Sequence, residues 1–176
     1  MGASRPRDRA APAGDGARRV SDVVRDPVVE ELALRDLVAR YADAVSRQDS
    51  ATVAACFAAD GVWSVGGYGE PAGHAEIAAF LDGLLDSWEV IVHALLSGRV
   101  HLDPTDHDRA TGRWYISEFG RRSDATEVFF AGVYHDEYVR EAGLWRFARR
   151  RYDSMFRRVG DDLTTSPFPP DAPAFP

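Results

Sequence analysis

Along the first half of the chain, apolar residues recur with the period of amphipathic helices. Between residues 27 and 48 they are spaced three and four apart on one face: Leu34, Leu37, Val38, Tyr41 and Val45. This pattern predicts a first helix, opened by Asp26-Pro27 and ended by Gln48-Asp49-Ser50. A short second helix is expected to run through Phe57, followed by a strand over residues 61–65. A third amphipathic helix is expected over residues 74–87.

The second half of the chain changes to the pattern of long strands. Four of them fit the sequence, at residues 89–103, 109–121, 126–140 and 143–156, and Asp, Pro and Gly residues supply the turns between them. Helices that come first and long strands that follow predict an α+β fold with an antiparallel sheet. They do not predict the alternation of a parallel α/β fold.

Both ends of the chain lack this periodicity. Residues 1–25 are small and polar without a pattern, which predicts a disordered N-terminal tail. Residues 159–176 are rich in proline, and from Ser166 onward they cannot continue a sheet, so we expect a loop or an arm. One domain over residues 26–158 is predicted between the tails.

Composition narrows the possible functions. The chain of 176 residues has a formal net charge of -7 and a pI near 5.2, which argues against a general binder of nucleic acids or anionic membranes. No apolar run approaches the roughly 18 residues of a membrane helix. A lone cysteine, Cys56, excludes an internal disulfide and is expected to be a buried structural thiol. Together these features predict a cytoplasmic protein.

Two ionisable residues interrupt apolar strand positions. His93 shares a strand face with Ile91 and Leu95, and Glu118 shares one with Trp114 and Ile116. A carboxylate on an apolar face must be paired or change its protonation. Because imidazole titrates near neutral pH, the two groups together suggest a pocket built for proton transfer.

The order of elements and several phrases resemble the SnoaL-like, or nuclear transport factor two-like, superfamily. The phrases are Leu37–Asp43, Cys56–Trp63, Gly132–Tyr138 and Gly143–Phe147, and the resemblance covers roughly residues 28–156. It implies a cone-shaped, curved antiparallel sheet that encloses a pocket with three N-terminal helices. The fold hosts many activities, so it does not by itself give a function.

In catalytic motif the chain is most similar to scytalone dehydratase and bile acid 7α-dehydratase. The resemblance implies catalytic roles for Tyr41, His93 and Glu118. Ser46 departs from the pattern, because the group usually carries a carboxylate at that position. Strand-borne aromatic residues are expected to line the substrate pocket: Trp63, Trp114, Phe130 and Tyr134.

Three other patterns have simpler explanations than a site. His101–Asp108 is rich in possible metal ligands, but it falls at a hairpin turn, where a solvated acidic loop is expected. Arg149-Arg150-Arg151 is expected to face solvent or another subunit. The glycine-rich stretch 66–73 lacks the ending of a phosphate loop. We therefore predict neither a metal nor a cofactor.

The leading hypothesis is a cofactor-independent dehydratase or related lyase that acts on a cyclic, carbonyl-bearing small molecule. His93 would remove a proton next to the carbonyl, Tyr41 would stabilise the enolate, and Glu118 would orient His93 or return the proton. A polyketide cyclase or isomerase of the same fold remains open, as does a non-catalytic binding domain. We also expect a homo-oligomer, with a trimer favoured and a dimer as the alternative.

Overall fold

The computed structural model describes Met1 and residues 25–176, so most of the predicted N-terminal tail lies outside the described residues. The helices are α1 (Pro27–Ser46), α2 (Ser50–Ala55), α3 (Gly73–Leu85) and a 3-10 turn, η1 (Gly66–Tyr68). The strands are β1 (Phe57–Ser64), β2 (Trp88–Leu102), β3 (Arg109–Arg122), β4 (Glu127–Glu141), β5 (Leu144–Val159) and β6 (Asp162–Thr165).

The long helix α1 forms as its sequence predicts. The side chain of Asp26 caps its start by accepting a hydrogen bond from the amide of Val28, and Pro27 occupies the first turn, where its missing N–H costs nothing. The apolar face is buried, and Leu34, Val38 and Tyr41 are each 0% exposed. Burial of this face fixes the helix against the sheet.

The strands of the described residues form one curved sheet in the order β1-β5-β4-β3-β2. The pairs along β2, β3, β4 and β5 are antiparallel, while β1 pairs parallel to the first half of β5. Short strand β6 pairs with the second half of β5. The α+β prediction and the cone-like curved sheet are therefore confirmed.

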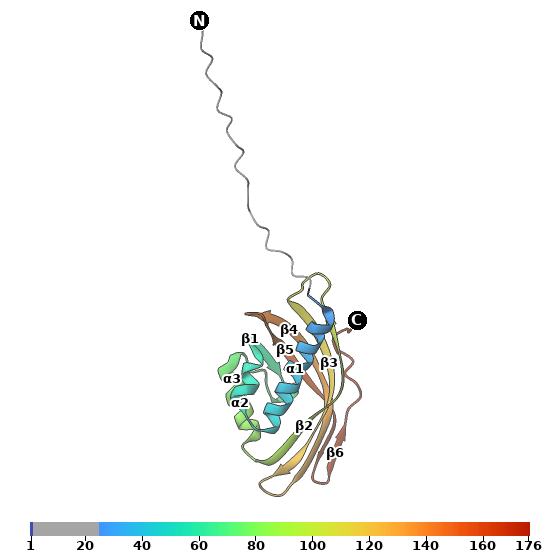
Figure 1. Cartoon of the computed structure of the whole chain (residues 1–176). Helices are drawn as coiled ribbons and strands as arrows, with labels where there is room; N and C mark the ends of the chain where they lie inside the picture. Colours follow the sequence, from blue (N-terminus) through green and yellow to red (C-terminus); the bar gives the residue numbers. More distant parts are fainter. Residues whose placement is uncertain (2–24) are drawn as a thin grey trace.

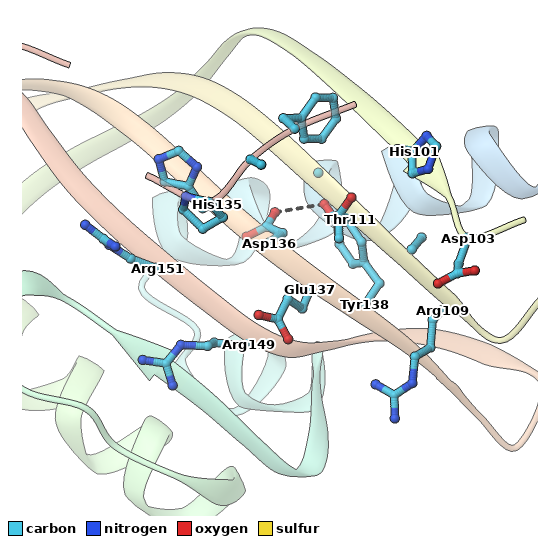
Figure 2. A pocket seen from close by; sticks show the side chains of 15 residues that line it. His101, Asp103, Arg109, Thr111, His135, Asp136, Glu137, Tyr138, Arg149 and Arg151 are labelled. Carbon is cyan, nitrogen blue, oxygen red and sulfur yellow. Dashed lines mark hydrogen bonds between the residues drawn. The ribbon is translucent and has the colours of Figure 1, made fainter. Parts of the chain in front are cut away.

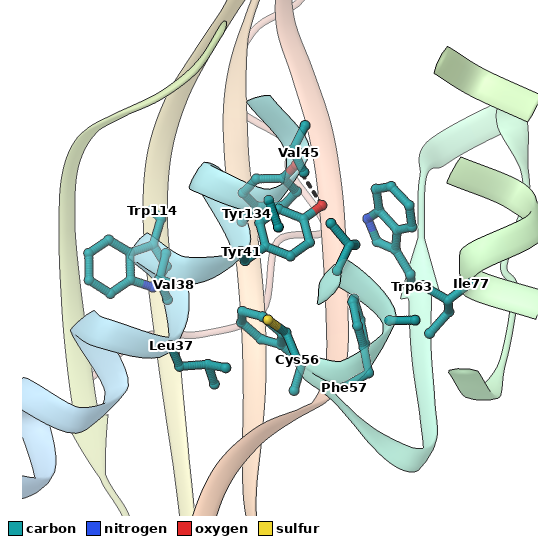
Figure 3. Close-up of a cluster of buried hydrophobic side chains, with 14 of the residues drawn as sticks. Leu37, Val38, Tyr41, Val45, Cys56, Phe57, Trp63, Ile77, Trp114 and Tyr134 are labelled. Carbon is teal, nitrogen blue, oxygen red and sulfur yellow. Dashed lines mark hydrogen bonds between the residues drawn. The ribbon is translucent and has the colours of Figure 1, made fainter. Parts of the chain in front are cut away.

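Helix α1 lies against the concave face of the sheet, and α2 and α3 stand beside β1 at its edge (Figure 1). The main core fills the space between them. Figure 3 shows Tyr41 in the middle of this core, between Trp114 on one side and Trp63 on the other. Cys56 is buried there too, and its thiol donates a hydrogen bond to the carbonyl of Thr52.

The C-terminal segment, residues 166–176, lies along the outer, convex face of the sheet and is here called the arm (Figure 1). Arg113 donates to the carbonyl of Pro173 at 2.7 Å, and Arg151 binds the carboxylate of Asp171 at 2.9 Å. The ring of Phe168 lies over the guanidinium of Arg113. The arm thus covers a band of cationic side chains.

Several boundaries differ from the sequence prediction. Helix α2 ends at Ala55, and Phe57 already belongs to β1, because the amide of Phe147 in β5 bonds to the carbonyl of Cys56. Strand β6 lies inside the segment that we expected to be a tail. Arg25, at the end of the predicted disordered tail, pairs with Asp108 at 2.6 Å.

Candidate active site

His93 and Glu118 face each other across neighbouring strands. They are direct partners in the register of β2 and β3, and His93 Nδ1 lies 2.6 Å from Glu118 Oε1. The His93 side chain is 0% exposed, whereas that of Glu118 is 19% exposed. The two residues that the alternation pattern singled out therefore form one hydrogen-bonded pair.

The other ring nitrogen, His93 Nε2, is buried and has no hydrogen-bond partner among the described residues. Because Nδ1 bonds a carboxylate, the neutral ring is expected to carry its proton on Nδ1. Nε2 then holds a free lone pair. Buried polar atoms in proteins normally have a hydrogen-bond partner, so the unpartnered Nε2 needs an explanation. A role as a general base, which needs a free lone pair, would explain it.

Ser46 takes part in the same arrangement through the backbone. Its hydroxyl accepts a hydrogen bond from the amide of His93 at 2.9 Å and donates one to the carbonyl of Ala42, also at 2.9 Å. Helix α1 thereby holds strand β2 in place at His93. The carboxylate that supports the imidazole comes from β3 rather than from the helix.

Tyr41 and Tyr134 bring two phenols to the other side of His93. Their hydroxyl oxygens lie 3.4 Å apart, and either can be the donor. The imidazole stacks on Tyr134 with 5.8 Å between ring centroids and meets Tyr41 edge-on at 5.7 Å. Burial raises the pKa of both phenols, with the Arg150 charge opposing the rise. Both therefore stay protonated and can act as hydrogen-bond donors.

Arg150 is a member of this cluster that sequence reasoning missed. It is fully buried, with its guanidinium carbon 4.2 Å from the Tyr41 ring centroid and 4.1 Å from that of Tyr134. Asp136 binds it through two hydrogen bonds of 2.8 Å. Burial opposes the charged form of Arg150, but the Asp136 carboxylate and the tyrosines raise its pKa overall.

A β-bulge explains why the sequence pattern did not identify Arg150 as a buried residue. Phe147 pairs with Tyr138 and Arg149 pairs with Glu137, so Ala148 is an extra residue in β5. Simple alternation from Phe147 would turn Arg149 inward. The bulge shifts the alternation by one residue and turns Arg150 inward instead.

A cavity of about 160 Å³ adjoins the cluster. Its walls include five of the predicted site residues: Tyr41, Trp63, Glu118, Phe130 and Tyr134. His93 does not itself line the space. Two of the lining residues, Trp63 and Tyr152, carry buried polar atoms without a partner among the described residues, at Nε1 and Oη. The cavity thus has mainly apolar walls.

Trp114, which was expected to bind substrate, does not line this cavity. It shares a strand face with Glu118 but lies four residues before it in β3. Its indole packs flat on the backbone at Gly98, where a Cβ would come within 2.0 Å of the ring, and its Nε1 donates to Tyr138 at 2.8 Å. Trp114 is therefore a core residue.

A larger cavity, of about 340 Å³, lies on the outer face beneath the arm (Figure 2). Charged residues of both signs surround it, including Arg109, Glu137 and Arg149. Burial lowers the pKa of His135, which also lines it. Glu118 and the phenols lie on the other face of the sheet, so this cavity does not share their chemistry.

In the described part of the chain, no three His, Cys, Asp or Glu side chains lie close enough to hold a metal ion. This includes residues 101–108, where Asp103 caps its own turn by accepting from the amides of Thr105 and Asp106. None of the described helices is both long and apolar enough to cross a membrane.

Comparison with known proteins adds two findings. Residues 27–151 match the family model of the SnoaL-like domain. No curated protein matches the sequence significantly.

Several solved structures share the fold. A protein of Novosphingobium aromaticivorans named as a candidate aromatic ring hydroxylase is 28% identical, covers 77% of this chain and 96% of its own, and has a TM-score of 0.69. A candidate scytalone dehydratase of the same species is 19% identical, with coverages of 84% and 97% and a TM-score of 0.70. The hexachlorocyclohexane dehydrochlorinase LinA-type3 of Novosphingobium barchaimii is 19% identical, with coverages of 80% and 96% and a TM-score of 0.68.

Proposed function

The chain belongs to the SnoaL-like domain family, and on that premise we propose that it is a cofactor-independent lyase of the dehydratase kind. Its substrate would be a cyclic small molecule with a carbonyl group. One observation carries the proposal: the His93–Glu118 contact of 2.6 Å lies beside an apolar cavity to which two phenols also contribute. Solved structures of the same fold include proteins named for the loss of water or of hydrogen chloride.

The reaction begins with removal of a proton from the carbon next to the carbonyl. His93 Nε2 accepts this proton, and the Glu118 carboxylate stabilises the imidazolium that forms. The electron pair of the broken C–H bond becomes the enolate. Tyr41 and Tyr134 donate hydrogen bonds to the enolate oxygen, and the buried charge of Arg150 behind them strengthens both donors.

The second step expels the hydroxyl group from the neighbouring carbon. A C=C bond forms, the C–O bond breaks, and the His93–Glu118 pair returns its proton to the leaving oxygen, so water departs and the pair is regenerated. Glu118 is suited to this transfer because it lines the cavity, whereas His93 does not. Since Nε2 is buried, a neighbouring side chain must move before substrate reaches it.

Two alternatives share parts of this site. A polyketide cyclase or isomerase of the fold would use the same first step, since both begin from an enolate. A non-catalytic binding domain would use the cavity without the proton transfer, and Ser46 in place of a carboxylate favours that alternative. A cytoplasmic location remains a prediction.

A mass-spectrometric screen of hydroxylated cyclic ketones for loss of water tests the proposal. With a substrate in hand, His93→Ala should abolish turnover, while Glu118→Gln should lower it about 10²–10⁴-fold because it keeps an acceptor but loses the charge. Tyr41→Phe should lower turnover about 10²-fold. His107→Ala and Glu127→Gln, at exposed positions, are the matched controls and should leave turnover unchanged.

The screen also separates the alternatives. Turnover that survives in folded His93→Ala but disappears in Glu118→Gln would make Glu118 the base and overturn the roles given above. Ligands that bind without any reaction would favour the binding domain. Ring closure without loss of water would favour the cyclase.

A further inference from the structure

Two arginines line the same cavity as the catalytic cluster. Arg122, the last residue of β3, and Arg157, in β5, both contribute to its wall. Among the described residues, neither guanidinium forms an ion pair, and Arg122 Nε is buried without a hydrogen-bond partner. By contrast Arg121, the residue before Arg122 in β3, binds Glu89 at 2.6 Å. In an acidic chain with many carboxylates available, two unpaired arginines in one cavity need a reason.

The two arginines lie at different levels of the cavity, Arg122 at the end of the sheet and Arg157 level with Glu118. Arg122 pairs in register with Trp88, the first residue of β2, so both lie at the end of the sheet. Glu118 is four residues back along the same face of β3, which puts their Cα atoms about 13 Å apart at ~3.3 Å per residue. Arg157 pairs in register with Phe130, a lining residue opposite Glu118 in β3.

Aromatic rings hold the two side chains. The guanidinium carbon of Arg122 lies 5.9 Å from the ring centroid of Trp88, and that of Arg157 lies 5.9 Å from the ring centroid of Phe130. Both aromatic residues line the cavity as well. Stacked guanidinium groups are restrained but keep their N–H donors free, and their planar fork matches a carboxylate.

From this arrangement we propose that the ligand of the cavity is an organic anion. Its ring packs against the apolar walls, and its acidic group, a carboxylate or an equivalent oxyanion, is bound by the unpaired guanidinium groups of Arg122 and Arg157. The inference relies on the proposed function for the position of the site, but not for the reaction.

Charge supports this assignment. Both guanidinium groups attract an anion that enters the cavity, whereas Glu118, the one acidic side chain among the described lining residues, already bonds to His93. Arginines that were merely solvated would be fully exposed, whereas both of these side chains are half-buried against cavity rings.

Calorimetric titration with a matched pair of probes tests the proposal. The probes are 2-naphthoate and 2-naphthamide, which share ring and shape but differ in charge. The wild-type chain should bind the carboxylate about 10- to 100-fold more tightly than the amide, as expected for charge-assisted hydrogen bonds. Added salt should reduce that preference, because the arginines are partly exposed.

Substitutions test whether Arg122 and Arg157 cause the preference for the carboxylate over the amide. Arg122→Gln and Arg157→Gln should each weaken binding of the naphthoate about tenfold and leave the naphthamide unchanged. Arg121→Gln and Arg158→Gln alter the neighbouring arginines, which are exposed, and should change neither affinity. Circular dichroism and the melting temperature confirm that each variant is folded.

Equal affinity for the two probes in the wild-type chain would overturn the proposal. So would a preference that the control variants reduce as much as Arg122→Gln and Arg157→Gln. Because these are binding measurements, they do not depend on turnover. A clear preference for the anion in a chain that eliminates no water would leave this inference standing and refute the lyase.

Discussion

The buried ion pair of Asp136 and Arg150 has two roles, one in packing the core and one in the proposed site. Both are 0% exposed, and the guanidinium fills the space among the rings of Tyr41, Tyr134 and Phe147. Removing water from two charges is costly, and the bidentate geometry offsets that cost. The same cation that completes the core also polarises the phenols of the proposed site.

This pair gives a sharp prediction for stability. Arg150→Met leaves Asp136 charged and buried, so it should lower the free energy of unfolding by about 3–5 kcal/mol. Arg150→Met with Asp136→Asn should recover part of that loss, because the unpaired charge is gone. Urea titration followed by tryptophan fluorescence measures both variants.

Arg149→Met is the matched control, because Arg149 pairs with Glu70 on an exposed surface. It should change the free energy of unfolding by less than about 0.5 kcal/mol. If Arg149→Met lowered the free energy of unfolding as much as Arg150→Met, the burial of Arg150 would not be the cause of its effect.

Among single residues, the sequence singled out two that the structure brings together. His93 and Glu118 stand out because each is an ionisable group on an apolar strand face, which is a local property. The positions of Arg150 and Trp114 have non-local causes. A bulge turns the first inward, and a close approach to Gly98 on the next strand fixes the second in the core.

Helix α2 illustrates how a short element depends on its cap. It has six residues, too few for a stable helix alone. Asp49 accepts hydrogen bonds from the Thr52 amide at 2.9 Å and the Thr52 hydroxyl at 2.7 Å. These bonds, the backbone one first, lower the pKa of the Asp49 carboxyl.

Asp49→Ala should therefore lower the melting temperature by about 2–4 °C at neutral pH, whereas Asp49→Asn keeps an acceptor and should lower it less. A carboxyl with a depressed pKa contributes stability above its ordinary value, near 3.9, and loses it as pH falls through the lowered value. The difference in melting temperature between wild type and Asp49→Ala should thus shrink below about pH 4. Calorimetric melting at several pH values measures this difference. A difference that does not change with pH would show that the charge of Asp49 does not contribute.

The outer face of the sheet has two halves with different chemistry. The arm covers the cationic half, around Arg113 and Arg151. The other half is apolar and open: Val90, Val92 and Phe119 are 48%, 38% and 45% exposed. Phe119 pairs in register with Val92 on one side and Phe129 on the other, so these residues are contiguous. A contiguous apolar patch of this kind is typical of an interface.

We therefore propose that the chain forms a homo-oligomer, a trimer or a dimer, through this apolar half. Light scattering should give a multiple of 19.4 kDa at micromolar concentration. Phe119→Glu should give the monomer mass, because a charge would be buried in the interface. Leu144→Glu, at an exposed turn position, is the control and should leave the mass unchanged. A wild-type chain that scatters as a monomer would refute the oligomer.

The sequence by itself determined most of the elements of this protein and singled out His93 and Glu118 as ionisable residues on apolar faces. Helical spacing and strand alternation are set by neighbours a few residues away, so α1 and the four long strands appear nearly where the pattern predicted them. The same alternation put His93 and Glu118 on apolar faces, and the pairing of β2 with β3 then made them partners.

Only the tertiary structure decided what surrounds that pair. The bulge in β5 brought Arg150 into the core, and the packing of α1 across the sheet brought Tyr41 to Tyr134. The arm found its cationic partners on strands far away in sequence. Each of these depends on register and curvature, which arise from contacts between distant segments and leave no periodic signal in the sequence.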